Sequence, residues 1–219
     1  MMLRFSSMLV VFLITYATFA QTTSRARTAG SQLIWEPPSW TFTDALPKAT
    51  VPKQMLATLR VSNFSVSLEN TKMEEVTSAL GGTIGQKGDA GNFEEWICFH
   101  GTDANGRWAL WLESGEIDGG SVGSFHWRRL SKSAVLDPRC QMLGEAKVEL
   151  PIALRLGTSE ADVLKILGRP TVWRSNSLLY VHEHQESIRG EPYDSVNVVV
   201  VLLRAGQVWS IEASKTTTS

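Results

Sequence analysis

The 219-residue chain is short of cysteine and has no excess charge of either sign. Its only cysteines are Cys98 and Cys140, and neither has a second ligand at the spacing of a C-x-x-C pair, which argues against a structural zinc site. The 21 Lys and Arg residues and the 22 Asp and Glu residues nearly cancel. Nucleic acids and anionic membranes attract concentrated basic charge, so we expect neither as a partner.

Common catalytic motifs are also missing. The Gly81-Gly82 and Gly119-Gly120 pairs come without the lysine and serine of a phosphate-binding loop. The sequence contains neither a G-x-S-x-G nucleophile elbow nor an H-E-x-x-H helix. We therefore predict no catalytic residues, no bound metal, no cofactor and a protein that is not an enzyme.

The N-terminus carries an apolar run, Met8 to Tyr16, which follows Arg4 and precedes the small-residue exit Thr18-Phe19-Ala20. This run is too short to span a bilayer as a helix, and the pattern is typical of a secretory signal peptide over residues 1–20. We predict an exported protein, periplasmic or secreted, with no membrane span in its mature form.

Export bears on the two cysteines. In an oxidising compartment Cys98 and Cys140 are expected to form a disulfide bond. The alternative is a buried free thiol in a strand and a second thiol in a linker.

Residues 21–54 are rich in Ser, Thr and Pro, and four prolines interrupt regular ladders and helices there. We predict an extended N-terminal arm. Trp35 and Trp40 are expected to pin this arm to the body of the protein, because large apolar rings gain by burial. The alternative is that both rings stay solvated or contact a partner.

An internal repeat organises the rest of the chain. NTKMEEVTSALG, residues 70–81, aligns without a gap with GTSEADVLKILG, residues 157–168. Each copy has a hydroxyl residue (Thr71, Thr158) as a helix cap, an acidic residue in the first turn, apolar residues four apart and a terminal glycine. Each copy therefore predicts a short amphipathic helix of about three turns.

Aromatic and aliphatic segments separated by turns follow each copy and predict antiparallel strands. These segments are 93–100, 107–113 and 124–130 after the first copy, and 178–184, 196–204 and 207–214 after the second. We predict an α+β fold of two tandem repeats, each a short helix or helix pair packed on an antiparallel β-meander. The repeats span 55–135 and 151–219, and the linker is 136–150. Two arrangements stay open: one fused sheet with a concave surface, or two separately packed units.

Three segments of the second repeat carry a family resemblance: Leu154 to Thr158 (LRLGT), Leu167 to Thr171 (LGRPT) and Leu203 to Val208 (LRAGQV). They resemble the module of the SmpA/BamE family of bacterial envelope proteins. Two such modules in tandem, in a secreted chain with a disulfide, are similar to the beta-lactamase inhibitory protein fold. The resemblance implies a bacterial host and a protein-binding sheet face, and it brings no catalytic residues.

The predicted strands place large rings on both faces of each sheet, because residues two apart share a face. A short helix can cover only one face, so the other is expected to bind protein. The residues predicted for this site are Trp96, Trp111, Trp127, Tyr180 and His182. The alternative is that the two repeats pack face to face, or that the arm covers the rings.

These features favour an exported, noncatalytic protein-interaction module, inhibitor-like or envelope-associated, whose protein partner is unidentified. Two other functions stay open. His182 and His184 project from one face of a strand and could place two imidazoles on one metal, as in a metal-dependent or hydrolytic secreted enzyme. A purely structural envelope protein, with no discrete site, is the third possibility.

Overall fold

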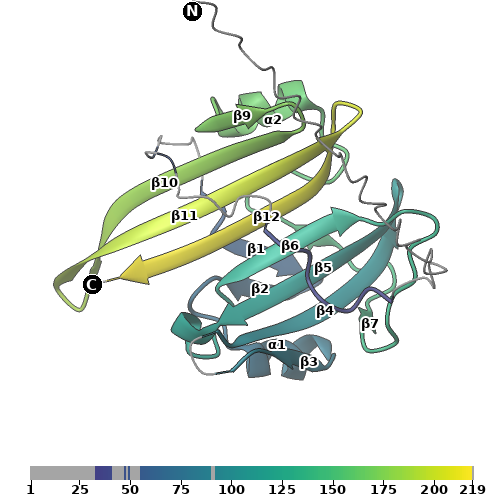
Figure 1. Ribbon diagram of the computed structural model, residues 1–219, viewed down its shortest axis with the longest axis horizontal. Helices are drawn as coiled ribbons and strands as arrows, with labels where there is room; N and C mark the ends of the chain where they lie inside the picture. The colour runs from purple at the N-terminus through teal and green to yellow at the C-terminus, as the bar shows by residue number, and fades with distance from the viewer. Residues whose placement is uncertain (1–32, 41–46, 48, 50–54, 90–91, 219) are drawn as a thin grey trace, which may run out of the picture. The chain divides into compact units, whose positions relative to one another are not determined.

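Strands dominate the structure (Figure 1). The computed structural model describes residues 33–40, 47, 49, 55–89 and 92–218. The predicted signal peptide, 1–20, lies outside the described residues, as does most of the predicted arm, 21–54. Of the part that is described, 51% of the residues are in strands and 11% are helical.

The main feature is a nine-stranded sheet. Its strands, in spatial order, are β3 (Ile84–Lys87), β4 (Glu94–Asp103), β5 (Gly106–Gly115), β6 (Ser124–Arg129), β12 (Gln207–Thr218), β11 (Glu191–Arg204), β10 (Ser177–Ile188) and β9 (Val172–Arg174). The ninth strand, β7 (Gln141–Met142), pairs in parallel with β4, and all the other pairs are antiparallel. All six predicted strand segments are present, and most strands are longer than predicted.

Pairing of β6 with β12 joins the two groups of strands, because Ser124 to Arg128 pair with Ser214 to Ser210. This finding corrects the predicted fold class. The α+β fold of two tandem helix-plus-meander repeats is wrong: the protein is mostly β, with one large antiparallel sheet and two short helices among the described residues. Each separate meander would have left an edge of unpaired backbone groups at this junction, and the β6–β12 ladder satisfies them.

The two helices lie near their predicted places but are shorter than predicted. α1 (Met73–Leu80) and α2 (Glu160–Leu167) each have eight residues. Glu75 caps α1 by accepting a hydrogen bond from the Lys72 N–H at 2.9 Å, and Ser159 caps α2 by accepting from the Asp162 N–H at 3.2 Å. The N-cap positions, Lys72 and Ser159, therefore fall one residue after the predicted threonines. Helices of this length cover only part of a wide sheet.

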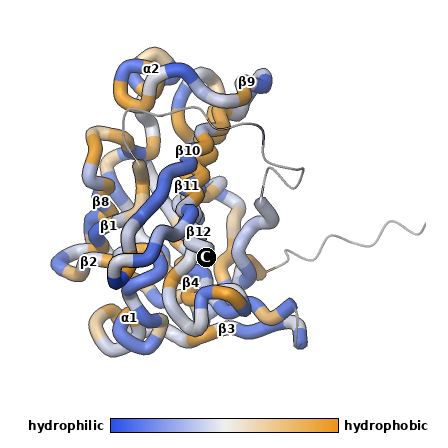
Figure 2. The backbone as a smooth tube through the Cα atoms, turned by 90° about the vertical axis from the view of Figure 1, so that its left-hand side faces the viewer, coloured by the Kyte–Doolittle hydropathy of each residue, from blue (hydrophilic) through white to orange (hydrophobic). Residues whose placement is uncertain are grey.

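The face that both helices cover, which we call the helix face, carries the main hydrophobic core (Figure 2). A small second sheet also packs there, with the order β2 (Phe64–Ser67), β1 (Thr58–Val61) and β8 (Val148–Glu149). Helix residues Met73 and Val163 meet strand residues such as Phe99 and Val199 in this core. The predicted linker, 136–150, thus contributes two strands, β7 and β8.

The opposite face, which we call the arm face, carries two smaller apolar clusters. The first contains Trp96, Cys98 and Trp111, and the second contains Leu179, Val181, Val198 and Val200. Chain segments without helices lie over this face. No helix in the described part of the chain is long and apolar enough to cross a membrane.

Candidate functional site on the arm face

Residues 33–40, which we call the arm segment, run over the arm face in front of β4, β5 and β6 (Figure 1). The Ile34 N–H donates to the carbonyl of Val135 at 2.9 Å, and the Ile34 carbonyl accepts from the N–H of Asp137 at 3.0 Å. These bonds pair the arm segment with residues 131–140, which we call the connection. An isolated parallel bridge between Ile34 and Leu136 therefore joins the arm segment to the connection.

Trp35 anchors the start of the arm segment. Its ring is 8% exposed and meets the ring of Trp96 edge to face, with 5.9 Å between centroids. The guanidinium of Arg139 lies 4.4 Å from the Trp35 ring centroid on the connection side. In the sheet below, Trp111 Nε1 donates to the Trp35 carbonyl at 3.1 Å. An aromatic ring packed between a ring and a cation is held by both dispersion and electrostatics.

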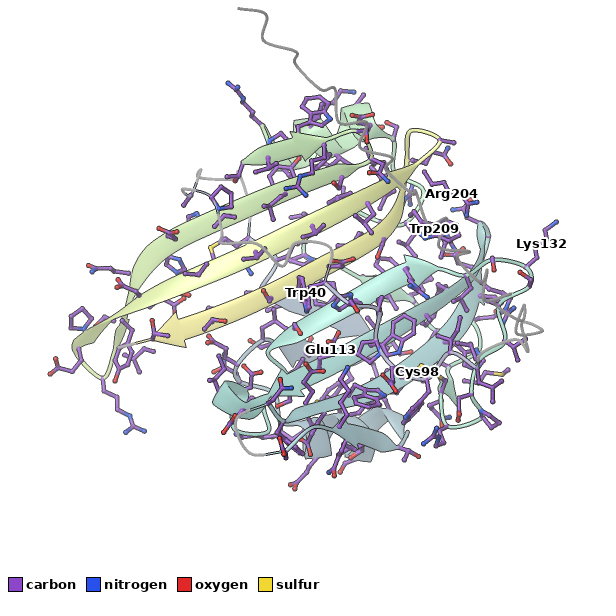
Figure 3. The ribbon with its side chains drawn as sticks, viewed as in Figure 1. Trp40, Cys98, Glu113, Lys132, Arg204 and Trp209 are labelled. Carbon is purple, nitrogen blue, oxygen red and sulfur yellow. A yellow bond between two sulfur atoms is a disulfide. The ribbon has the colours of Figure 1, made fainter. Side chains whose placement is uncertain are left out.

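Trp40 ends the arm segment in the middle of the face. Its ring stands edge to face on His126, with 4.6 Å between centroids, and it packs against the cluster around Val198. The structure confirms that Trp35 and Trp40 hold this part of the arm to the body. Figure 3 places Trp40 above the lower strands, near Glu113.

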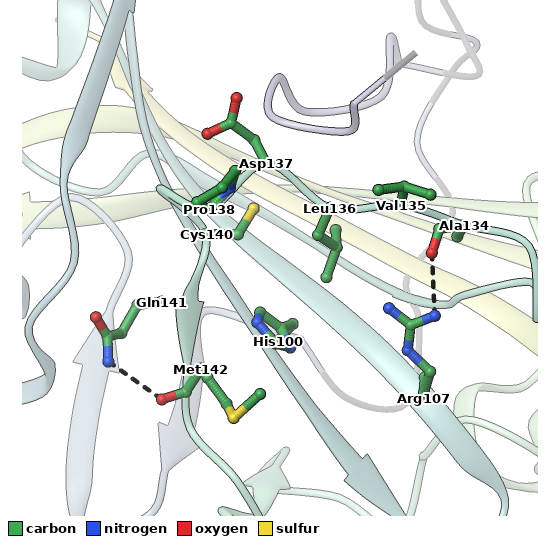
Figure 4. A pocket seen from close by; sticks show the side chains of 10 residues that line it. All are labelled: His100, Arg107, Ala134, Val135, Leu136, Asp137, Pro138, Cys140, Gln141 and Met142. Atoms are coloured by element: carbon green, nitrogen blue, oxygen red, sulfur yellow. Dashed lines mark hydrogen bonds between the residues drawn. The ribbon is translucent and has the colours of Figure 1, made fainter. Parts of the chain in front are cut away.

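The disulfide bond fixes the connection. Cys98 of β4 is bonded to Cys140, across a sequence separation of 42, and this confirms the predicted pairing. Beside it lies a cavity of about 480 Å³ between the connection and the strands (Figure 4). Arg107 crosses this cavity and donates to the Ala134 carbonyl at 3.0 Å. Burial, together with the Arg107 charge, lowers the pKa of His100 in the same cavity, which favours a neutral imidazole there.

An acid-histidine-acid cluster lies beneath Trp40. Glu113 Oε1 lies 3.2 Å from His126 Nε2, and Glu212 Oε1 lies 3.9 Å from His126 Nδ1. Burial, reinforced by the charge of Arg128, lowers the pKa of His126 to about 3. Burial raises the pKa of Glu113 well above its usual value, and the neighbouring carboxylates raise it further. This environment favours a neutral imidazole beside a protonated carboxyl group.

Chemically, this cluster lacks the parts of a nucleophilic site. Neither ring nitrogen of His126 has a partner with hydrogen-bond geometry among the described residues, so no hydroxyl group is poised against it. The Trp40 ring packs against the imidazole as well. The arrangement can respond to pH, but it has no activated nucleophile.

Four of the five residues predicted to bind protein are buried. Trp96 and Trp111 lie in the arm-face core, and Trp127 and Tyr180 lie in the helix-face core; all are at most 4% exposed. The exposed aromatic face expected on these four side chains is therefore not present. The arm segment and the connection cover one pair, and the helix-face layer covers the other.

His182, the fifth predicted residue, is half-buried and lies beside His184, with 4.9 Å between ring centroids. His184 Nε2 lies 2.9 Å from Glu186 Oε1, and Lys215 Nζ is 2.9 Å from the same carboxylate oxygen. Burial lowers the pKa of His182, and His184 adds to this effect. Within the described residues, no group of three or more His, Cys, Asp or Glu side chains is arranged to hold a metal ion.

Sequence reasoning missed a stripe of half-exposed residues along the β6–β12 junction, Trp40, Arg128 and Trp209, which we call the seam surface. Glu212 pairs with His126, under Trp40, and Ser210 pairs with Arg128. His126 and Arg128 are two residues apart on β6, so they share a face and lie about 7 Å from one another. Arg128 is therefore next to Trp40, whose ring stands on His126. Trp209 comes next, at the bulge where β12 shifts register against β11.

Comparison of the chain with protein-family models, with curated proteins and with solved structures gives no match. The resemblance to SmpA/BamE modules therefore stays a prediction.

Proposed function

We propose that the chain is an exported, noncatalytic protein-interaction module, an inhibitor-like or envelope-associated binder that contacts a protein partner through the seam surface. One observation carries this proposal: two tryptophans and an arginine stay half-exposed, in a row, on the face that no described helix covers. Tryptophan and arginine are enriched among the residues that supply most of the binding energy at protein interfaces.

Rigid support strengthens the proposal. Arg128 lies 5.2 Å from the ring centroid of buried Trp111, and Trp40 is seated on His126. Side chains that are already positioned lose less entropy when a partner binds. The proposed site moves from the buried residues Trp96, Trp111, Trp127 and Tyr180 to the seam surface, because only exposed atoms can contact a partner.

Export is supported by the disulfide bond and by the signal-peptide pattern over residues 1–20. The absence of a membrane-spanning helix from the described residues is compatible with a mature chain that acts in the periplasm or outside the cell.

The test is affinity capture with the mature protein as bait, from envelope and culture-supernatant extracts of the host. Arg128→Ala and Trp40→Ala are compared with the wild type, and retained proteins are quantified by mass spectrometry. The matched control is Trp173→Ala, because Trp173 is 56% exposed on strand β9, away from the seam surface. Thermal unfolding of each bait shows that it is folded.

We expect a stoichiometric protein that the wild type and Trp173→Ala retain and that both seam variants lose. Equal retention by all four baits would exclude the seam surface as the binding site. If the wild type retains nothing, the proposed function fails.

A further inference from the structure

A cavity of about 650 Å³ opens at the end of the large sheet where the β11–β12 turn approaches the ends of β5 and β6. Its lining residues include four with cationic side chains, Arg107, Arg129, Lys132 and Arg204, and no Asp or Glu. We call it the basic pocket. Figure 3 shows Lys132, Arg204 and Trp209 at this corner, apart from Trp40 and Glu113. Cations that gather around a cavity create a positive potential that attracts anions.

One of the four cations already forms an ion pair within the protein. Arg129 is 8% exposed, and its Nη1 lies 2.6 Å from Asp103 Oδ1. The Arg107 guanidinium donates to the Ala134 carbonyl in the cavity beside the disulfide bond, so it adds positive charge next to the basic pocket. Lys132 and Arg204 are exposed and make no ion pair with any described residue. Two cations without an ion pair to a described residue, Lys132 and Arg204, therefore remain to contact a ligand in the pocket.

The pocket also has an aromatic wall. The Arg204 guanidinium lies 4.8 Å from the ring centroid of Trp209. Stacking uses the flat face of the guanidinium and leaves its in-plane N–H groups free to donate to a carboxylate or phosphate. The half-exposed indole offers apolar surface next to those donors.

We infer that the basic pocket binds an oxyanion, a carboxylate, phosphate or sulfate group, that is attached to an aromatic or other apolar group. The oxyanion contacts Arg204 and Lys132, and the apolar group packs on Trp209. The same chemistry belongs to a free small anion and to an acidic side chain of another protein. The pocket shares Trp209 with the seam surface, but its test needs no protein partner, so it can succeed or fail independently of the proposed function.

The test follows the indole N–H signal of Trp209 by NMR in the full mature protein. The chain has eight tryptophans, so Trp209→Phe identifies the signal by its loss. The probes are phenyl phosphate and a short capped peptide with one phenylalanine and two aspartates. Phenol, which shares the ring and lacks the anion, is the uncharged control.

The variant Lys132→Ala with Arg204→Ala removes the two exposed cations, and Arg169→Ala removes an exposed cation outside the pocket. We expect a saturable shift with at least one anionic probe, unchanged by Arg169→Ala. The double variant weakens that binding by about tenfold or more, because charge-assisted hydrogen bonds are lost. Saturation by phenyl phosphate alone points to a free anion, and saturation by the peptide alone points to a protein segment.

Three results would overturn the inference: shifts that stay linear with both anionic probes, equal affinity in the double variant, or phenol binding as tightly as phenyl phosphate. Each shows that the cations do not form a binding site. Since both substituted side chains are exposed, the double variant is expected to fold, and thermal unfolding verifies this.

Discussion

The indole N–H of Trp111 donates to the backbone carbonyl of Trp35 at 3.1 Å, across 76 positions of sequence. This bond ties the arm segment to the middle of β5. The bond gives the buried Trp35 carbonyl a hydrogen-bond donor, and leaving that carbonyl without one would cost free energy. The arm segment is therefore part of the folded core.

Replacing Trp111 by Phe removes this donor and keeps most of the ring. We expect the free energy of unfolding to fall by about 1–2 kcal/mol, as is usual when a buried acceptor loses its partner. Urea denaturation measures the change. Trp209→Phe is the matched control, because it makes the same substitution at a half-exposed ring, and it should cost much less. Equal losses would show that ring size, and not the hydrogen bond, accounts for the effect.

Reduction of Cys98–Cys140 should destabilise the protein by about 4 kcal/mol, because the bond closes a loop with a sequence separation of 42. Denaturation with and without a dithiol reductant gives this difference. The connection also holds Ile34, so proteolysis within the arm segment should become faster on reduction. A reduced protein with unchanged stability would contradict the role of the disulfide as an anchor.

His126 makes stability depend on pH in the acid range. Its pKa is about 3 in the folded protein, below the usual value of 6.5. As pH falls below about 6.5, the unfolded chain binds a proton that the folded protein does not, so stability decreases until about pH 3, by on the order of 5 kcal/mol. His126→Gln should flatten this part of the stability curve. A variant that keeps the wild-type slope would assign the pH dependence to other groups.

Glu113 acts in the opposite direction. Its pKa is raised in the folded protein, so the folded protein keeps a proton that the unfolded chain releases as pH rises above the unfolded pKa. Stability is therefore highest below the unfolded pKa and falls as pH rises up to the folded pKa. Glu113→Gln mimics the protonated form. Relative to the wild type, this variant should therefore gain stability with rising pH, by about 1.4 kcal/mol per pH unit until the folded pKa is reached. The comparison is a series of urea titrations from pH 5 to pH 9. A constant difference between the two proteins would contradict a raised pKa.

Ser159 tests the cap of α2. Ser159→Ala removes the oxygen that accepts the Asp162 N–H, and it should lower the free energy of unfolding by about 1 kcal/mol. The control is Ser78→Ala in α1, whose hydroxyl donates to the Glu74 carbonyl inside the helix. Alanine is the better helix former there, so the control should be neutral or slightly stabilising. A neutral Ser159→Ala would show that water replaces the cap.

Local patterns predicted much of the secondary structure. The segments 70–81 and 157–168 contain the two helices, because their caps, apolar spacing and terminal glycines act within a few residues. The strand segments were predictable for the same reason: alternation and turns are local signals. The prediction went wrong at the N-cap by one position in each helix, because the threonine hydroxyls accept from backbone N–H groups before the helices, Thr71 from Ser67 and Thr158 from Arg155.

By itself, the sequence determined the helices, most strands, the pairing of the only two cysteines and the near-neutral charge, all of which follow from composition or from neighbours along the chain. Only the tertiary structure decided that β6 pairs with β12 to form one sheet, that Trp111 and Trp127 are buried, and that Glu113, His126 and Glu212 meet under Trp40. The reason is that strand pairing and burial join residues far apart in the chain. Their register depends on which surfaces pack together, and no local pattern records that choice.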